Sequence, residues 1–267
     1  MRVGVIGTGN MGRALIQGLV PARGSDVRVL AHDSDTSALR NLPAGVKTAP
    51  LSSWAATRPP LDAVVIAVKP KDVPAALETF RSSHSQSFNP TWISIAAGVT
   101  ISRLQALLGG KARICRVMPN TPALVGTGVS AVAAGPGCRR KDVRLCGKIL
   151  GAVGTVVEVP ERLMDTVTGL SGSGPAYVYL FIEALIEAGV SGGLSHADAA
   201  ACAVQTVLGA ARMVEETGES PSVLKSRVMS PGGTTVEGLR ALEEHRFKFA
   251  VGEAVRRAAR RSAELGG

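Results

Sequence analysis

The feature that most constrains the fold of this chain is a glycine-rich segment near its start. The segment GTGNMG at 7–12 follows the apolar run at 3–6 and opens a helical pattern over 11–20. Glycines at these positions permit a tight turn and a close approach of the backbone to a pyrophosphate, whose charge the helix N-terminus stabilises. A plain strand–helix turn can carry the same spacing. The combination of strand, glycines and helix favours a dinucleotide site.

The first part of the chain alternates short apolar runs with helical patterns. The runs expected to form strands lie at 3–6, 27–30, 63–68, 92–95, 114–117, 130–133 and 155–159. The patterns expected to form helices lie at 11–20, 73–80, 101–108 and 141–150. The run VVIAV at 64–68 shows no polar alternation, as in a strand covered on both faces. The alternation predicts an α/β fold, with a dinucleotide-binding Rossmann-like domain and a parallel sheet over residues 1–159.

From Pro160 onward the pattern is helical, which predicts a second, all-helical domain over residues 160–267. The expected helices lie at 176–190, 196–216, 221–228, from 234 onward and at 247–264. The segment 176–190 is apolar over most of its circumference, and a small helical domain buries such a helix poorly by itself. We therefore expect this helix to pack against another subunit.

Composition excludes several classes of protein. Hydrophobic residues make up 45% of the chain and charged residues 19%, which argues against intrinsic disorder. The net charge of +9 suits an anionic ligand, but only 3% of the residues are aromatic, so we expect no nucleic-acid partner. The cysteines form no CxxC pair and the histidines lack metal-ligand spacing, so no metal site is expected. Without a secretory signal or a long apolar run, we expect a cytoplasmic protein that does not enter the membrane.

Asp33 follows the second expected strand. An acid at this position can accept hydrogen bonds from the ribose 2′-hydroxyl of NAD, and it repels the 2′-phosphate of NADP. It can equally cap a helix that begins near Asp35. No arginine stands beside Asp33, so the sequence by itself favours NADH.

Three further segments are candidates for ligand binding. AVKP at 67–70 and SIAAG at 94–98 end expected strands at the edge of the sheet where ligands bind in such folds. Lys69 either faces an anionic or carbonyl group there or is solvated. In the second region, SPGGTT at 230–235 leads directly into a helix. The exposed N–H groups of such a turn suit a carboxylate or phosphate, although an ordinary helix start has the same pattern.

Taken together, these segments resemble the pyrroline-5-carboxylate reductase family, and the resemblance covers nearly the whole chain. The matching motifs are VGVIGTGNMG at 3–12, AVKP at 67–70, SIAAGVTI at 94–101, RVMPNTPALVGTG at 116–128, TGLSGSGPAYV at 168–178 and SPGGTT at 230–235. The last three are far more specific than a glycine-rich loop, because nucleotide binding alone does not require them.

The resemblance implies hydride transfer from NADPH or NADH to the C=N bond of 1-pyrroline-5-carboxylate, which gives L-proline in the last step of proline biosynthesis. It also implies a Rossmann domain followed by a helical dimerisation domain. The helices of two subunits interleave in such a homodimer, and the dimers can assemble further into a ring such as a decamer.

Site residues carry over by position. On the cofactor side they are Ile6, Gly7, Thr8, Gly9, Asn10, Met11, Ser52, Ala67, Val68, Lys69, Pro70, Ile95, Ala96 and Ala97. On the substrate side they are Glu161, Ser230, Gly232, Gly233, Thr234 and Thr235. The loop at 230–235 matches the loop that holds the substrate carboxylate. Thr235 matches the threonine proposed to hydrogen-bond the ring nitrogen, and it is the expected catalytic residue.

Two positions depart from the family pattern, and two other functions stay open. Asp33 stands where some members have a small hydroxyl residue, and Arg227 stands where some have asparagine. A β-hydroxyacid dehydrogenase would need a catalytic lysine in the second region, where Lys225 is the only lysine between 160 and 247. A dinucleotide-sensing protein without turnover would keep GTGNMG but need not keep SPGGTT.

Overall fold

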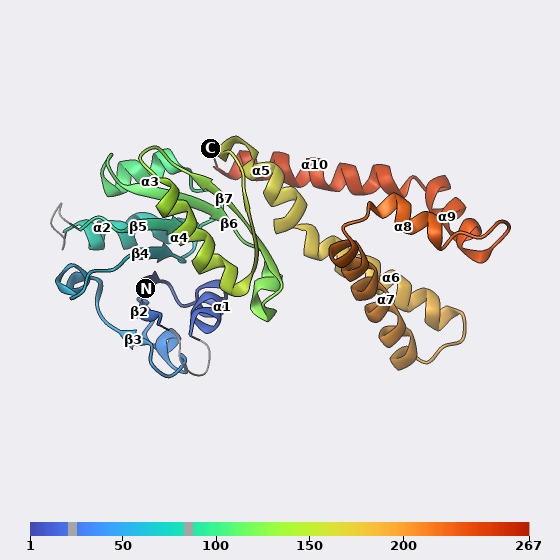
Figure 1. The fold of residues 1–267 in the computed structure, drawn as a ribbon, viewed down its shortest axis with the longest axis horizontal. Helices are drawn as coiled ribbons and strands as arrows, with labels where there is room; N and C mark the ends of the chain where they lie inside the picture. The colour runs from blue at the N-terminus through green and yellow to red at the C-terminus, as the bar shows by residue number, and fades with distance from the viewer. Residues whose placement is uncertain (21–25, 83–87, 267) are drawn as a thin grey trace. The chain divides into compact units, whose positions relative to one another are not determined.

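The chain forms two compact units (Figure 1). The computed structural model describes residues 1–20, 26–82 and 88–266. The first unit comprises Met1–Ser173 together with Arg257–Gly267, and the second comprises Gly174–Arg256. The first is built on a sheet and the second is helical. This architecture confirms the predicted α/β class with a Rossmann-like sheet followed by helices.

One eight-stranded sheet organises the first unit, in the order β3-β2-β1-β4-β5-β6-β7-β8. The strands are β1 (Arg2–Ile6), β2 (Arg28–His32), β3 (Lys47–Thr48), β4 (Ala63–Ile66), β5 (Thr91–Ser94), β6 (Arg113–Met118), β7 (Gly128–Ala134) and β8 (Gly154–Glu158). All neighbours pair in parallel except β6 and β7, which are antiparallel. The strand order reverses between β1 and β4, and such a reversal leaves a crevice at the carboxyl ends of the strands.

Helices cover both faces of this sheet. Successive residues of β4 alternate between two buried clusters, with Val65 in one and Ile66 in the other. The cluster around Ile66 includes residues of α2 (Val73–Ser82) and α3 (Ile101–Leu108), and the cluster around Val65 includes residues of α1 (Asn10–Leu19) and α4 (Arg140–Leu150). Burial of each large aliphatic side chain contributes about 1.5–3 kcal/mol. The apolar run in β4 is thus buried on both faces, as predicted.

Two later segments complete the first unit. The helix α5 (Met164–Val167) continues into a π-helical turn over Thr168–Gly172. The end of α10 (Phe247–Gly266) also belongs to this unit, where the Ser262 hydroxyl donates a 2.7 Å hydrogen bond to the Asp165 carboxylate. A residue near the end of the chain therefore helps to hold the sheet unit together.

The second unit is made of helices whose starts follow from the sequence. They are α6 (Gly174–Ser191), α7 (His196–Thr217), α8 (Pro221–Arg227), α9 (Thr234–Glu244) and the first part of α10. Ser195 caps α7, because its hydroxyl oxygen accepts a 3.1 Å bond from the N–H of Asp198. A Cβ added to Gly189 would lie 3.0 Å from the Cβ of Ala199, so glycine lets α6 and α7 pack closely.

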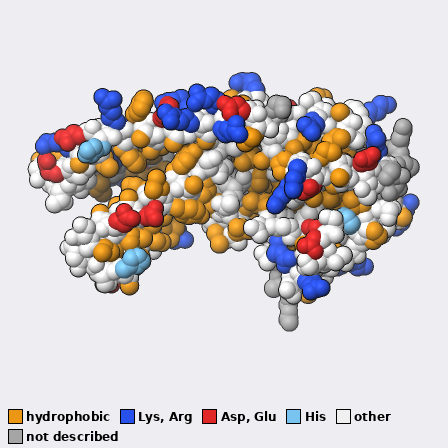
Figure 2. Space-filling view, turned by 180° about the vertical axis from the view of Figure 1, so that it is seen from behind, with side chains coloured by type: hydrophobic (Ala, Val, Ile, Leu, Met, Phe, Trp, Pro, Cys, Tyr) orange, Lys and Arg blue, Asp and Glu red, His pale blue; other side chains and the backbone are white. Residues whose placement is uncertain are grey.

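The helix α6 has no buried residue within one chain. Tyr179 is 61% exposed and Leu180 is 66% exposed, and Val178 and Phe181 are exposed as well. Hydrophobic side chains gather over the surface of the helical unit in Figure 2. Contiguous apolar surface of this kind marks an interaction site.

The last strand, β8, ends at Glu158, and the later described elements are helical. The compact units divide further along, after Ser173, and the end of α10 returns to the first unit. Within the described part of the chain, no helix combines the length and hydrophobicity needed to cross a bilayer.

Candidate active site

The predicted cofactor residues gather at one edge of the sheet. Ile6 ends β1, Asp33 follows β2, the segment 67–70 follows β4, and the segment 95–97 follows β5. These four strands are parallel and adjacent in the order β2-β1-β4-β5, so their carboxyl ends meet. The fold therefore brings together, at the point where the strand order reverses, residues that are far apart in the sequence.

The glycines of the first loop have three different surroundings. Gly7 has a φ of +97°, and a Cβ there would lie 2.8 Å from the backbone nitrogen of Val68. A Cβ on Gly12 would lie 2.1 Å from the carbonyl oxygen of Gly7. A Cβ on Gly9 would meet no atom within 4 Å. Gly7 and Gly12 thus permit close packing of the loop, whereas Gly9 leaves open space in front of α1.

The start of α1 suits a phosphate group. Gly9 is the N-cap residue and supplies no side-chain hydrogen bond, and the first turn contains no acidic residue. The first N–H groups of a helix lack partners within the helix, and together with the helix dipole they favour an anion. Open space at Gly9 and this uncapped N-terminus fit the pyrophosphate of a dinucleotide.

Asp33 is tied to the glycine loop by Thr8. Its Oδ2 accepts hydrogen bonds from the Thr8 N–H at 2.6 Å and from the Thr8 hydroxyl at 3.0 Å. Its Oδ1 accepts a 3.0 Å bond from the Asp35 N–H. The cap of the short 3₁₀ helix at Thr36–Leu39 is Asp35, whose carboxylate accepts from the Ser37 N–H. Asp33 is therefore not the helix cap, and it links the end of β2 to the loop after β1.

Two other predicted cofactor residues are exposed. Ser52 lies in the 3₁₀ helix Leu51–Ala56, which Trp54 anchors in the core with a fully buried side chain. Lys69 precedes the 3₁₀ turn Pro70–Asp72 that follows β4. Both side chains are accessible to a ligand.

Glu161 is engaged with two neighbours in the first unit. Its Oε1 accepts a 2.8 Å bond from the N–H of Ile101, the first residue of α3, and a 3.1 Å bond from Arg116. The Arg116 side chain is only 10% exposed, so this pair is partly shielded from solvent. No spacing pattern in the sequence points to Arg116 as a site residue, although it begins the motif RVMPNTPALVGTG. The contacts give Glu161 a structural role at the start of α3.

The turn at 230–235 lies in the second unit, at the start of α9. The Gly233 N–H donates a 2.9 Å bond to the carbonyl of Ser230, and Gly233 is the N-cap residue without a side-chain hydrogen bond. Gly232 has a φ of +68°, which glycine tolerates best. Thr234 is exposed and Thr235 is half-buried in the first turn of the helix. The turn thus offers backbone N–H groups and a threonine hydroxyl to a carboxylate-bearing ligand.

Arg227, which departs from the family pattern, forms a two-pronged ion pair with Glu219. Its Nη1 donates to Oε1 at 2.7 Å, and its Nη2 lies 2.6 Å from Oε2. The guanidinium is therefore neutralised within the second unit. Glu161 belongs to the first unit and the turn at 230–235 to the second.

Comparison with known proteins agrees with the motifs. The protein-family model described as pyrroline-5-carboxylate reductase dimerisation matches residues 161–265. A second family model, described as NADP oxidoreductase coenzyme F420-dependent, matches residues 2–98. The pyrroline-5-carboxylate reductase of Methanosarcina acetivorans is 40% identical over 266 residues, which cover 99% of this chain and 98% of that protein. The chain belongs to the pyrroline-5-carboxylate reductase family.

Solved structures of the family have the same fold. The reductase from Coxiella burnetii superposes with a TM-score of 0.92 at 36% identity, covering 99% of this chain and 98% of that one. The pyrroline carboxylate reductase from Plasmodium falciparum, solved with NADP bound, gives 0.83 at 32% identity, covering 100% and 98%. The predicted resemblance is confirmed, and the chain is an NAD(P)H-dependent oxidoreductase acting on a C=N bond.

Membership of this family does not favour the two other functions considered from the sequence, a β-hydroxyacid dehydrogenase and a dinucleotide sensor without turnover. It gives the chain the dimerisation domain of the family, in the region where α6 exposes its apolar side chains. Among the described residues, no group of three His, Cys, Asp or Glu side chains is placed to hold a metal ion.

Proposed function

We propose that this chain reduces the C=N bond of 1-pyrroline-5-carboxylate to give L-proline, the last step of proline biosynthesis. The observation that carries the proposal is the similarity to named reductases over 99% of the chain. The open space at Gly9 and the uncapped start of α1 support it, because both suit the pyrophosphate of a dinucleotide.

The residues of the first unit bind the cofactor. The loop residues Ile6, Gly7, Thr8, Gly9, Asn10 and Met11 hold the pyrophosphate, and Asp33 and Ser52 contact the adenosine side. The residues Ala67, Val68, Lys69, Pro70, Ile95, Ala96 and Ala97 line the remaining length. The bound nicotinamide supplies the hydride. The small side chains after β5 leave room for its ring.

The residues of the second unit bind the substrate. Backbone N–H groups of the turn at Gly232 and Thr234 hold the carboxylate, with the Ser230 hydroxyl beside them. Gly233 shapes this substrate-binding turn, because its N–H bonds to the carbonyl of Ser230. A helix start binds this charge without a flexible cation, so the ring is presented in one orientation, which is catalysis mainly by positioning. Glu161 is a further substrate-side residue by its family position.

Reduction of an imine requires a proton on nitrogen, and we assign this step to Thr235. Its hydroxyl donates a hydrogen bond to the ring nitrogen and relays a proton from water. Threonine is a poor acid, so its main role is orientation of the imine. The half-buried position of Thr235 in the first turn of α9 supports this role.

Cofactor binding belongs to the domain of residues 1–159. Substrate binding and dimerisation belong to the domain of residues 160–267. The active protein is a homodimer in which α6 packs against the partner, and the dimers assemble into a larger ring such as a decamer. The protein acts in the cytoplasm on a small substrate, without a nucleic-acid or membrane partner.

The decisive experiment mixes purified protein, 1-pyrroline-5-carboxylate, and either NADH or NADPH. Oxidation of the cofactor is followed by absorbance, and proline is measured independently. Stoichiometric proline formation supports the proposal. Cofactor binding without oxidation would overturn it and favour a sensor or a different imine substrate.

A further inference from the structure

We infer that the cofactor site favours NADH over NADPH, because Thr8 fixes the carboxylate of Asp33 where the two cofactors differ. The inference rests on the proposed function, since it concerns the same dinucleotide site. In Rossmann folds, the acid after the second strand meets the ribose 2′-hydroxyl of NAD, and NADP carries a phosphate at that position.

Asp33 is held by bonds from both sides. The backbone N–H and the hydroxyl of Thr8 both point to Oδ2, at 2.6 and 3.0 Å, and the Asp35 N–H points to Oδ1 at 3.0 Å. Thr8 is only 1% exposed, so water cannot reach its N–H. If Asp33 turned away, this buried N–H would be left without a hydrogen-bond acceptor, which costs free energy. The carboxylate therefore cannot swing aside cheaply to admit a phosphate.

The Arg13 side chain near this turn is already engaged. The guanidinium of Arg13 donates to the carbonyls of Ala38, Arg40 and Asn41 at 2.7–3.2 Å. Asp35 adds a second negative charge to the turn, and hydrogen bonds from Ser37, with a smaller effect of the Arg40 charge, hold the pKa of its carboxyl below its ordinary value. A 2′-phosphate would therefore meet two carboxylates, and the Arg13 guanidinium is committed to backbone carbonyls.

The same arrangement suits a ribose hydroxyl. Each carboxylate oxygen can accept more than one hydrogen bond, and among the described residues a single N–H, that of Asp35, donates to Oδ1 of Asp33. A 2′-hydroxyl can donate to this oxygen, whereas a phosphate oxygen can only repel it. The Asp33 carboxylate and the 2′-phosphate would repel each other at contact distance, in surroundings with the effective dielectric of a protein surface. This repulsion should raise the Kd for NADPH above that for NADH by a factor on the order of ten or more.

The test measures binding without turnover. Purified protein is titrated with NADH and with NADPH, and the dissociation constants are obtained from nicotinamide fluorescence. The expected Kd for NADPH is about tenfold higher or more than that for NADH. Equal constants, or tighter binding of NADPH, would overturn the inference.

Four variants locate the cause. Asp33→Ser and Asp33→Asn should each lower the NADPH/NADH ratio of Kd by about tenfold, chiefly through tighter NADPH binding. Asp33→Asn keeps one acceptor oxygen for Thr8, so it separates charge from loop stability. Thr8→Ala removes the hydroxyl and should lower the ratio by less. Asp35→Ser, the matched charge removal in the same turn, should change it least.

Arg40→Ala tests the opposite assignment. If Arg40 turns to hold a 2′-phosphate, this variant will weaken NADPH binding selectively, which would contradict the inference. An unchanged ratio of the two dissociation constants supports the inference.

The binding titration contains no substrate, so its outcome is independent of the proline-forming assay. A protein that binds NADH more tightly than NADPH in the titration, but forms no proline in the assay, refutes only the proposed function. A protein that forms proline with equal constants for both cofactors refutes only this inference.

Discussion

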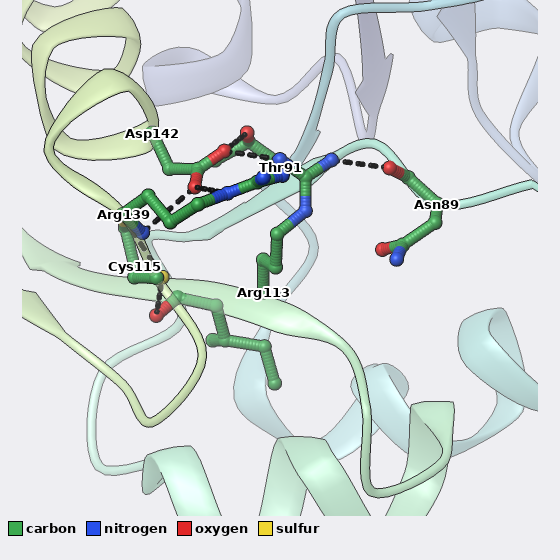
Figure 3. A network of polar contacts seen from close by, with 8 residues as sticks. Asn89, Thr91, Arg113, Cys115, Arg139 and Asp142 are labelled. Carbon is green, nitrogen blue, oxygen red and sulfur yellow. Dashed lines mark hydrogen bonds and ion pairs between the residues drawn. The ribbon is translucent and has the colours of Figure 1, made fainter.

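The hydroxyl of Thr91 donates a 2.7 Å hydrogen bond to the carboxylate of Asp142, which lies 51 residues further along the chain. Figure 3 shows Asp142 at the centre of a network that also includes Arg113 and Arg139. Its side chain is only 2% exposed, and it accepts a 2.8 Å bond from the Arg139 N–H and pairs with the Arg113 guanidinium. One carboxylate thus joins the starts of β5, β6 and α4.

Removing this carboxylate should destabilise the protein strongly. Asp142→Ala leaves Arg113 largely buried without its counter-charge, and breaking a buried pair in this way costs about 3–5 kcal/mol. The free energy of unfolding is measured by urea titration at one fixed protein concentration, because association contributes to stability. Glu237→Gln, which breaks an exposed pair with Arg240, should cost less than about 1 kcal/mol. Equal losses in the two variants would contradict this account.

Stability should also fall in acid because of Asp142. Burial raises the pKa of this carboxyl, but the Arg139 N–H, the Thr91 hydroxyl and the Arg113 charge outweigh it and hold the pKa below its ordinary value. The unfolded chain therefore binds this proton more readily than the folded protein. The contribution is complete above the unfolded pKa of about 4 and is lost as the pH falls through the lower folded pKa.

Urea midpoints measured from neutral pH down to about pH 3 test this dependence. The parent protein should lose stability more steeply with acid than Asp142→Asn, because the variant has no proton to take up at this position. Parallel curves for the two proteins would show that other carboxyl groups cause the acid sensitivity.

The elements that could be predicted from sequence are those with a local signal. The glycine loop, the doubly buried strand β4 and the Ser195 cap of α7 each depend on residues close together in the chain. The strand β3 was missed because its two residues, Lys47 and Thr48, are too few and too polar to form a hydrophobic pattern.

The polar contacts that organise the site could not be predicted in this way. Thr8 lies 25 residues from Asp33, and Arg116 lies 45 residues from Glu161. Each pair forms only after the sheet has aligned its strands, and no spacing rule connects them. The sequence could suggest that Asp33 faces a ribose, but not that both of its oxygens are already held by the protein.

The glycine loop can be tested with a matched pair of alanine substitutions. Gly9 has a φ of −64° and open space around it, so Gly9→Ala should leave the melting temperature unchanged. Its methyl group would occupy the phosphate space, and the Kd for NADH should rise by about tenfold or more. Gly12→Ala would place a Cβ 2.1 Å from a backbone oxygen, so it should impair both folding and binding. Unchanged affinity in Gly9→Ala would place the pyrophosphate elsewhere.

The apolar surface of α6 predicts that the protein is not a monomer. Sedimentation at micromolar concentration should show no 27.5 kDa species for the parent chain. Leu180→Arg should produce that species, because a charge in an apolar interface loses its hydration. Leu265→Arg is a matched control, since Leu265 is 67% exposed against 66% for Leu180. A parent protein that sediments as a monomer, or equal dissociation in both variants, would contradict an interface centred on α6.

The last prediction concerns Thr235. If its hydroxyl orients the imine and relays the proton, Thr235→Ala should lower kcat/KM by about 10²–10⁴. Thr235→Ser retains the hydroxyl and should recover most of the activity, whereas Thr234→Ala removes the exposed neighbouring hydroxyl and should have a smaller effect. Cofactor affinity should be equal in all three variants, because Thr235 lies in the second unit and the glycine loop in the first. Unchanged kinetics in Thr235→Ala would exclude the hydroxyl from the reaction and leave the carboxylate-binding turn as the only contribution of α9.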